Sequence, residues 1–368
     1  MKVIVLADAW PAIPLLIREM CRQGIEVLYL SPDVPSASEL GRYCRQRRAP
    51  GMHDPGYRGY LLSVLESEPF DYLLPLCDVL QHLAWDLPPA YAGRVFPALD
   101  PAIRRLFTDR RMMYRFVREL GIATPRAVDS VDVGALAAIG DTLGWPLVLR
   151  GIQGCGGSQV SIAADEATAR TAFARLSRSG PVFAQEFIRG NLYVAGALAD
   201  RGQIGQLFVA KVLESWPSPT GPAIRVLSVD DPALRDQCSK LFAALHGHGL
   251  IMADFIRPAH GEPCFLEVNL RFWGSIHAAE ICGAPLIAPY VKLLREAPLP
   301  PPRTYAVGRR VTLFPQFVTA RLDAGAFPRL ADLPHYFAML ASLRRLSIPL
   351  LRHYLRRLYW RYAWHRAR

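Results

Sequence analysis

Lysine is scarce in this sequence. Only four of the 43 basic residues are lysines, and the other 39 are arginines. The formal net charge is +11, and the excess is uneven because residues 344–368 carry eight arginines and no acidic residue. A basic segment of this kind can meet nucleic acid, anionic lipid or an acidic substrate, or it can be the solvated face of a helix.

Long apolar runs and paired cysteines are also missing. No stretch of about 18 uninterrupted apolar residues occurs, which predicts no membrane-spanning helix. The start of the chain, with a short apolar run and then Pro11 and Pro14, indicates a core strand entering a turn and not a secretory signal. The seven cysteines form no CxxC pair and are odd in number. They exclude a disulfide or zinc framework and predict a reducing, cytoplasmic compartment.

The first hundred residues predict a small open α/β domain. Apolar runs at 2–7, 25–30 and 71–76 alternate with a helical pattern at 14–21. Strand, helix and strand at this spacing form a βαβ unit with a parallel sheet. No GxGxxG follows the first run, so the chain lacks the main signature of a dinucleotide-binding domain.

The middle of the chain alternates between strand and helix patterns. Residues 101–120 predict one helix, and WPLVLR (145–150) predicts a strand that leads into the glycine-rich GIQGCGGSQVSI. VFAQEFI (182–188) predicts a strand that ends at a glycine, and a hinge between two lobes is expected there. Beyond the proline-rich residues 298–302, the pattern indicates a helical appendix.

The glycine-rich loop is a candidate phosphate-binding element. Gly154, Gly156 and Gly157 let the backbone bend and bring N–H groups close to phosphate oxygens. An ordinary β-turn explains the same residues equally well. Because more strand pattern follows instead of a helix, a Walker-type P-loop is not expected.

Acidic and amide side chains mark a second candidate element. Glu267 and Asn269 lie two apart on a predicted strand, so they share a face, and Asp254 lies on the neighbouring strand of the same predicted hairpin. Mg²⁺ favours a few carboxylates plus substrate phosphates, so these three residues are candidate metal ligands. Arg271, two further along, could stabilise a transferred phosphoryl group, or form a salt bridge to Glu267 or Asp254.

Other residues have weaker signals. LESWPSPTGPAIR (213–225) indicates a mobile loop, in which Arg225 could hold a substrate carboxylate. Asp78 could touch substrate or cap a helix. His246 and His248 suggest a metal site or, more simply, a loop.

These features occur in an order that resembles the ATP-grasp superfamily, in its carbamoyl-phosphate-synthase-like or carboxylate–amine ligase branch. WPLVLRGIQGCGGSQV resembles a strand with a basic residue that enters a glycine-rich lid. AQEFIRG resembles the adenine-binding hinge, and TDRRMMYRFVRELGIATP resembles the helix before the lid. ADFIRPAHGEPCFLEVNLRFWGS is similar to the metal-binding hairpin.

The resemblance implies an α/β protein in four parts. An open pre-ATP-grasp domain (1–100) precedes a linker helix and lid (101–185), a C-terminal lobe with the metal site (186–300), and a proline-rich linker with a basic helical tail (301–368). It also implies ATP and Mg²⁺, with Mn²⁺ as an alternative ion.

The resemblance further implies roles for individual residues. Asp254, Glu267 and Asn269 hold Mg²⁺, while Arg271 and Lys211 act on the reacting groups. Substrate candidates are Arg225 and Ser275. The implied nucleotide contacts are Arg110, Arg150, Gly154, Gly156, Gly157, Ser158, Glu186, Phe187 and Ile188.

The implied activity is an ADP-forming ligation of a carboxylate to an amine through an acyl phosphate. Arg110 and Arg150 stand where the family has lysines, which favours an alternative: a nucleotide-binding regulator or scaffold without catalysis. The expected partners are small-molecule acids and amines, with no nucleic acid. A homodimer and peripheral membrane contact through the basic tail, at the inner membrane face, are further hypotheses.

Overall fold

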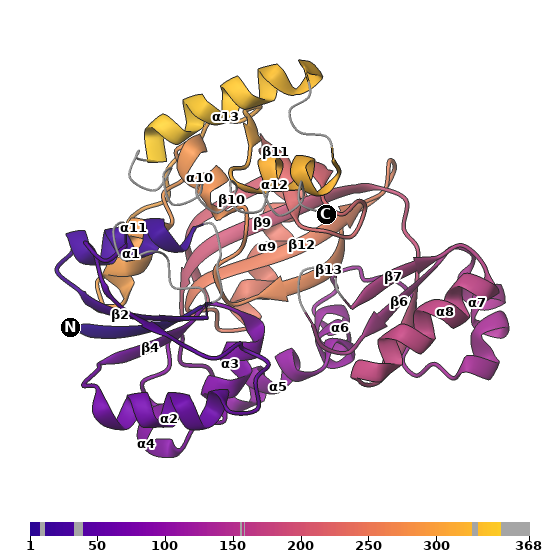
Figure 1. Ribbon diagram of the computed structural model, residues 1–368. Helices are drawn as coiled ribbons and strands as arrows, with labels where there is room; N and C mark the ends of the chain where they lie inside the picture. The colour runs from indigo at the N-terminus through magenta and orange to yellow at the C-terminus, as the bar shows by residue number, and fades with distance from the viewer. Residues whose placement is uncertain (8–11, 33–39, 155–156, 158, 326–329, 347–368) are drawn as a thin grey trace.

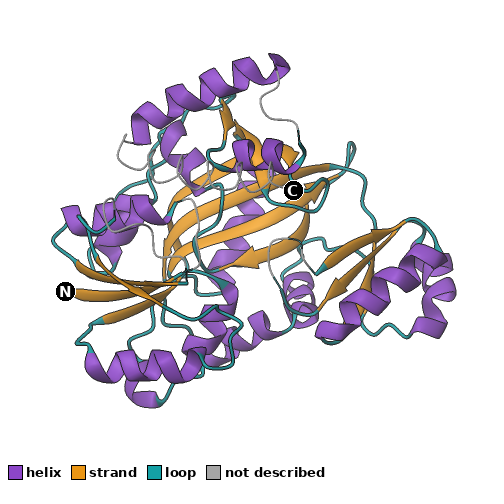
Figure 2. Cartoon of the chain, viewed as in Figure 1, coloured by secondary structure: helices purple, strands orange, loops and turns teal. Residues whose placement is uncertain are grey.

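Three β-sheets organise the protein (Figures 1 and 2). The structure is a computed structural model that describes residues 1–7, 12–32, 40–154, 157, 159–325 and 330–346. None of the described helices is long and apolar enough to cross a membrane.

The N-terminal domain is the predicted open α/β unit. Its four strands are parallel and lie in the order β3-β2-β1-β4. The strands β1 and β2 are buried along almost their whole length, as expected for a parallel sheet that helices cover on both faces. The elements are β1 (Lys2–Leu6), α1 (Ile13–Arg22), β2 (Glu26–Ser31), β3 (Arg45–Arg48), α2 (Tyr57–Ser67), β4 (Tyr72–Pro75), α3 (Asp78–Trp85) and α4 (Pro89–Ala92).

The single helix predicted over 101–120 is wrong, because the segment forms two helices. Helix α5 (Pro101–Thr108) ends at Asp109, and α6 (Arg110–Glu119) begins directly after it. Asp109 has extended backbone angles, and its carboxylate accepts a hydrogen bond from the backbone N–H of Arg111. An aspartate that caps the next helix in this way ends the preceding one. The break places Arg110 at the start of α6, where its N–H bonds to Ile152 O at 3.1 Å.

The lid forms a separate sheet with its own apolar core. Its strands lie in the order β5-β8-β6-β7, and two helices pack on them. The side chains of Asp165 and Thr168 form a capping box at the start of α8. The elements are β5 (Ala127–Val128), η1 (Val133–Ala135), α7 (Leu136–Leu143), β6 (Leu147–Gly151), β7 (Val160–Ala163), α8 (Glu166–Leu176), η2 (Ser177–Ser179) and β8 (Val182–Glu186).

The C-terminal lobe is built on a six-stranded antiparallel sheet in the order β13-β12-β9-β10-β11-β14. Helix α9 packs on one face, while α10 and α11 belong to the core on the other face. The elements are β9 (Asn191–Asp200), β10 (Gln203–Ser215), β11 (Ala223–Val229), α9 (Pro232–Ala244), β12 (Gly249–Arg257), β13 (Cys264–Asn269), α10 (Ile276–Cys282) and α11 (Ile287–Leu293).

The segment after residue 300 is not wholly helical. Strand β14 (Arg310–Thr312) pairs with β11 and extends the large sheet, which the sequence did not predict. Three residues are too few for a recognisable pattern of alternation. The helices that follow are α12 (Gln316–Asp323), η3 (Leu330–Asp332) and α13 (Leu333–Leu346).

A glycine on the central strand β9 tests the packing of this sheet. A Cβ atom at Gly196 would overlap the ring of Trp273. We therefore expect Gly196→Ala to lower the free energy of unfolding by about 1–3 kcal/mol, measured by urea denaturation. Gly59 lies in α2 with open space around it, so Gly59→Ala is the control and should stabilise by about 0.5–1 kcal/mol. Equal effects of the two substitutions would contradict the packing described here.

Candidate active site

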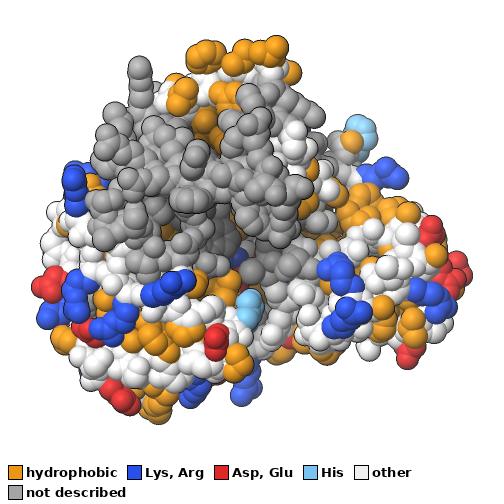
Figure 3. Space-filling model, viewed as in Figure 1, with side chains coloured by type: hydrophobic (Ala, Val, Ile, Leu, Met, Phe, Trp, Pro, Cys, Tyr) orange, Lys and Arg blue, Asp and Glu red, His pale blue; other side chains and the backbone are white. Residues whose placement is uncertain are grey.

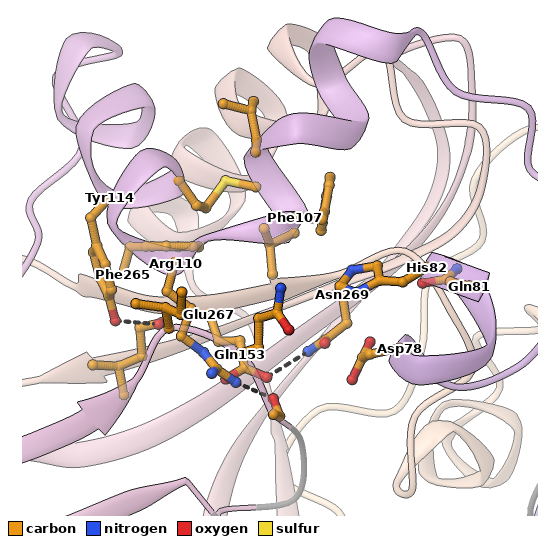
Figure 4. Close-up of a pocket in the computed structure, with 16 residues that line it drawn as sticks. Asp78, Gln81, His82, Phe107, Arg110, Tyr114, Gln153, Phe265, Glu267 and Asn269 are labelled. Atoms are coloured by element: carbon orange, nitrogen blue, oxygen red, sulfur yellow. Dashed lines mark hydrogen bonds and ion pairs between the residues drawn. The ribbon is translucent and has the colours of Figure 1, made fainter. Parts of the chain in front are cut away.

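A cleft lies where the N-terminal domain, the linker helices, the lid and the large sheet meet. It is partly open to solvent. Figure 4 shows Arg110 and Tyr114 on one side and Asp78 and His82 on the other. The lining residues come from α3, α5, α6, the loop after β6, and β13. They are Asp78, Gln81, His82, Leu106, Phe107, Arg110, Met113, Tyr114, Ile152, Gln153, Gly154, Phe265, Leu266, Glu267, Val268 and Asn269.

The structure brings the predicted metal ligands together. Asp254 on β12 lies directly opposite Glu267 on β13, and Asn269 lies two residues further along. Directly paired residues, and residues two apart, share one face of a sheet. Burial, and then the neighbouring Glu267 carboxylate, raise the pKa of Asp254 to about 7. The amide of Asn269 donates a hydrogen bond to Glu267 at 3.2 Å.

Two arginines converge on the Glu267 carboxylate. Arg150 Nη2 lies 3.0 Å from Glu267 Oε2, and Arg110 Nη2 lies 3.4 Å from the same oxygen. Burial alone would raise the pKa of Glu267, but the guanidinium groups outweigh it and the pKa is lowered. Glu267 is thus held ionised, whereas the Asp254 carboxylate forms no ion pair or hydrogen bond with a described residue.

Both arginines are fixed by further contacts. Arg110 donates to the backbone oxygens of Gly151 and Gly154 and so ties α6 to the glycine-rich loop. Arg150 is buried and donates to the Tyr114 hydroxyl at 2.6 Å, while that hydroxyl donates to Leu266 O. Tyr114 is one of two aromatic side chains in a strongly basic helix, and no sequence pattern marked it as part of the site.

Arg271 is held by the N-terminal domain. Its guanidinium pairs with both oxygens of Asp78, at 2.6 and 2.8 Å, and donates to Asn269 Oδ1 at 3.1 Å. The alternative considered from the sequence, a salt bridge from Arg271 to Glu267 or Asp254, is therefore wrong, because the carboxylate that pairs with Arg271 is Asp78. The predicted helix cap is wrong as well, because Cys77 occupies the cap of α3 and the Asp78 side chain turns into the cleft.

The described glycines of the loop after β6 have positive φ angles. Gly154 lies at +123° and Gly157 at +77°, which other residues adopt at a cost. A Cβ at Gly157 would overlap Thr220 O, so the loop touches the turn between β10 and β11. Gly156 and Ser158, two of the predicted phosphate contacts, lie outside the described residues.

The predicted hinge lies at the end of β8. The Glu186 carboxylate accepts from Arg126 Nε at 2.6 Å and from its backbone N–H at 2.9 Å. This carboxylate is therefore already engaged within the lid. The adjacent residues Phe187 and Ile188 are half-buried and lie outside any strand, so contact of this segment with a purine stays a prediction.

Lys211 and Ser275 do not line the cleft. Ala210, Val194 and Asp254 lie side by side on neighbouring strands and share one face of the sheet. Lys211 is the next residue after Ala210 and pairs with Tyr193. Because successive side chains of a strand alternate, Lys211 lies on the face opposite Asp254. Ser275 precedes α10 without capping it. A catalytic or substrate role for either stays a prediction.

The prediction of a mobile loop over 213–225 is wrong, because strands occupy both ends of this segment. Strand β10 continues to Ser215 and β11 begins at Ala223, so only a short turn connects them. Arg225 lies on β11 and pairs with Glu214 at 3.4 Å. Its contact with a substrate carboxylate is therefore untested, and the ion pair would have to open first.

The histidine pair does not form a metal site. His248 Nδ1 lies 2.9 Å from Asp200 Oδ1, and its ring packs against Phe96. Within the described ranges, no group of three or more His, Cys, Asp or Glu residues could hold a metal. The simpler interpretation as a loop at a helix end is supported.

Residues 107–275 match the sequence model of the ATP-grasp domain. Residues 107–275 therefore form an ATP-grasp domain. The match spans α6, the lid and the β12–β13 hairpin, which form the cleft together with α3 and α5. Comparison with curated proteins gives no significant match.

Solved structures share the fold at low sequence identity. The biotin carboxylase domain dimer of Hydrogenobacter thermophilus 2-oxoglutarate carboxylase, in complex with MgADP, ADP and bicarbonate, has 14% identity and a TM-score of 0.68, covering 84% of this chain and 73% of its own. L-amino acid ligase from Bacillus licheniformis has 17% identity and a TM-score of 0.63, covering 80% and 74%. N5-carboxyaminoimidazole synthetase from Staphylococcus aureus, complexed with ADP, has 12% identity and a TM-score of 0.65, covering 83% and 79%.

The carboxylate pair makes the stability of this ATP-grasp protein depend on pH. The pKa of Asp254 is raised from 3.8 to about 7 in the folded state, so wild type loses stability as the pH rises through this window. We expect Asp254→Asn to remove this loss. Relative to wild type, the variant should gain up to about 4 kcal/mol between pH 4 and pH 8, measured by urea unfolding without divalent metal. The exposed Asp141→Asn is the control, and a pH-independent difference for Asp254→Asn would contradict the expectation.

Proposed function

We propose that this protein is an ADP-forming ligase that activates a carboxylate as an acyl phosphate and joins it to an amine. The observation that carries the proposal is that Arg110, Glu267 and Asn269 line one cleft beside the lid loop. Arg150 pairs with Glu267 there, and Arg271 donates to Asn269. Such a set combines charges for a triphosphate with oxygen ligands for a cation. The shared fold with a biotin carboxylase domain and an L-amino acid ligase supports this reaction class.

The donor set fits a divalent cation. Asp254 and Glu267 are two carboxylates side by side, and burial, followed by their mutual repulsion, raises the pKa of Asp254. A bound Mg²⁺ would neutralise them and polarise the transferred phosphate. Two carboxylates and the Asn269 amide are few ligands, which suits an ion that keeps waters and phosphate oxygens in its shell.

The side chains of this chain supply positioning and charge. Arg110 and Arg150 bind the phosphates of ATP, and Arg150 is oriented by Tyr114. The substrate carboxylate attacks the γ-phosphorus, which releases ADP and leaves an acyl phosphate beside Arg271. The amine then attacks the acyl carbon, phosphate leaves with the bonding electrons, and the amine nitrogen loses a proton. The lid loop near Gly154 keeps water from the acyl phosphate.

Glu267 offers the most direct test of this function. We expect Glu267→Gln to reduce Mg²⁺-dependent ADP release by at least about 100-fold, because the variant removes a cation ligand and the partner of two arginines. The assay uses a panel of carboxylic acids and amines. Glu262→Gln is the matched control, since Glu262 is exposed in the turn between β12 and β13 of the same hairpin.

The alternative, a nucleotide-binding regulator or scaffold, predicts a different outcome. It draws support from the two ion pairs that occupy Glu267. In that case ATP binds without turnover, and Glu267→Gln leaves the nucleotide affinity unchanged. This result, obtained with every acid and amine tested, would replace the ligase proposal.

Peripheral membrane contact stays a prediction of the basic C-terminal sequence. Helix α13 exposes Leu333, Phe337 and Leu340 at helical spacing, and hydrophobic side chains gather over it in Figure 3. We expect the full chain, but not a chain lacking residues 340–368, to sediment with vesicles that contain anionic lipid. Undiminished binding of the shortened chain, or equal binding to neutral vesicles, would contradict it.

A further inference from the structure

The cleft extends beyond the proposed phosphate site toward helix α3. Asp78 and His82 lie one turn apart on the same face of α3, and both line the cleft. In Figure 4 they lie across the cavity from Arg110 and Tyr114. This end of the cleft is formed by the N-terminal domain and α5, and none of the roles assigned above uses it.

Apolar side chains cover much of this end. Trp85 links two rings that line the cleft, because its ring centroid lies 6.2 Å from that of Phe107 on α5 and 5.3 Å from that of His82. This packing fixes the Phe107 and His82 rings beside the cavity. Over the cleft as a whole, the other apolar lining side chains are Leu106, Met113, Ile152, Phe265 and Val268.

The charged side chains that line the cleft are already paired. Asp78 is bound by Arg271 through both oxygens, and Arg110 is bound to Glu267 and to two backbone oxygens. His82 faces Asp78 and Asp86 from its own helix and the backbone of Phe107 from α5. Each of these three groups favours the charged imidazole, but burial outweighs them and lowers the pKa of His82, so the imidazole is neutral near pH 7. No unpaired cation is therefore left among the described lining residues.

We propose that the α3 end of the cleft binds the amine substrate, and that it selects an amine with an apolar, uncharged substituent. The proposal rests on the proposed ligase function and adds the class of acceptor. An apolar substituent that packs against Phe107 and Leu106 is removed from water, which makes its binding free energy more favourable. An acidic substituent would be buried without a counter-charge, which is strongly unfavourable. The neutral His82 imidazole is available to accept a hydrogen bond from the amine.

The first test measures binding without turnover. The full chain, with Mg²⁺ and a non-hydrolysable ATP analogue, is titrated calorimetrically with 3-methylbutylamine, 2-phenylethylamine and L-glutamate. The two apolar amines should bind at least about tenfold more tightly than L-glutamate. Equal or tighter binding of L-glutamate, or no binding of either apolar amine, would overturn the proposal.

Two substitutions assign the binding to this end of the cleft. Phe107→Ala should weaken both apolar amines at least about tenfold and leave the affinity for the ATP analogue within about twofold. Phe337→Ala is the matched control, because Phe337 is 68% exposed on α13. Leu106→Lys adds a cation at a half-buried position and should invert the preference toward L-glutamate. Unchanged amine binding in both cleft variants would overturn the proposal, and thermal unfolding verifies that each variant is folded.

Failure of this inference can be told apart from failure of the ligase function. If the apolar amines bind as expected but no acid supports ADP release, the acceptor site stands and the ligase proposal fails. If ADP release occurs only with acidic amines, the ligase proposal stands and the acceptor inference fails.

Discussion

The Glu267 carboxylate is the point on which the architecture of the site depends. It lies on the large sheet, while its two guanidinium partners come from elsewhere: Arg110 from the start of α6 and Arg150 from the lid strand β6. One half-buried negative charge thus gathers three segments of the chain around the cleft. Removing either arginine would leave part of that charge uncompensated.

The same charges explain how the site could accept a nucleotide with its cation. Two arginines and two carboxylates form a nearly neutral cluster, in which Asp254 is the member that forms no ion pair with a described residue. In the proposed reaction, the arginines bind phosphate oxygens in place of Glu267, and the two carboxylates bind a divalent ion. Each ion pair that opens is replaced by another of the same kind, so the net cost of the exchange is small. Arginine in place of lysine fits this scheme, because its fork can hold carboxylate and phosphate oxygens together.

Local patterns predicted much of this arrangement, and long-range pairing accounts for what they did not predict. The two-residue alternation of strands is enough to place Glu267 and Asn269 on one face opposite Asp254. It says nothing about Asp78, whose partner Arg271 is 193 residues away. Helical periodicity runs through 101–120, but the single capping aspartate Asp109 divides it. Lys211 shows how sensitive the strand argument is, because one residue of register decides which face of the sheet a side chain occupies.

The lid and the C-terminal helices are connected through the β10–β11 hairpin. At its tip the backbone of Thr220 meets the lid loop at Gly157. In its stem Glu214 pairs with Arg225 and with Arg321 of α12, at 3.4 and 2.7 Å. Because Arg321 also binds the buried Asp332, a displacement of the C-terminal helices would strain this hairpin. The described residues between 301 and 346 are therefore tied to the large sheet and do not form an independent appendix, and β14 pairs with β11 at the edge of that sheet.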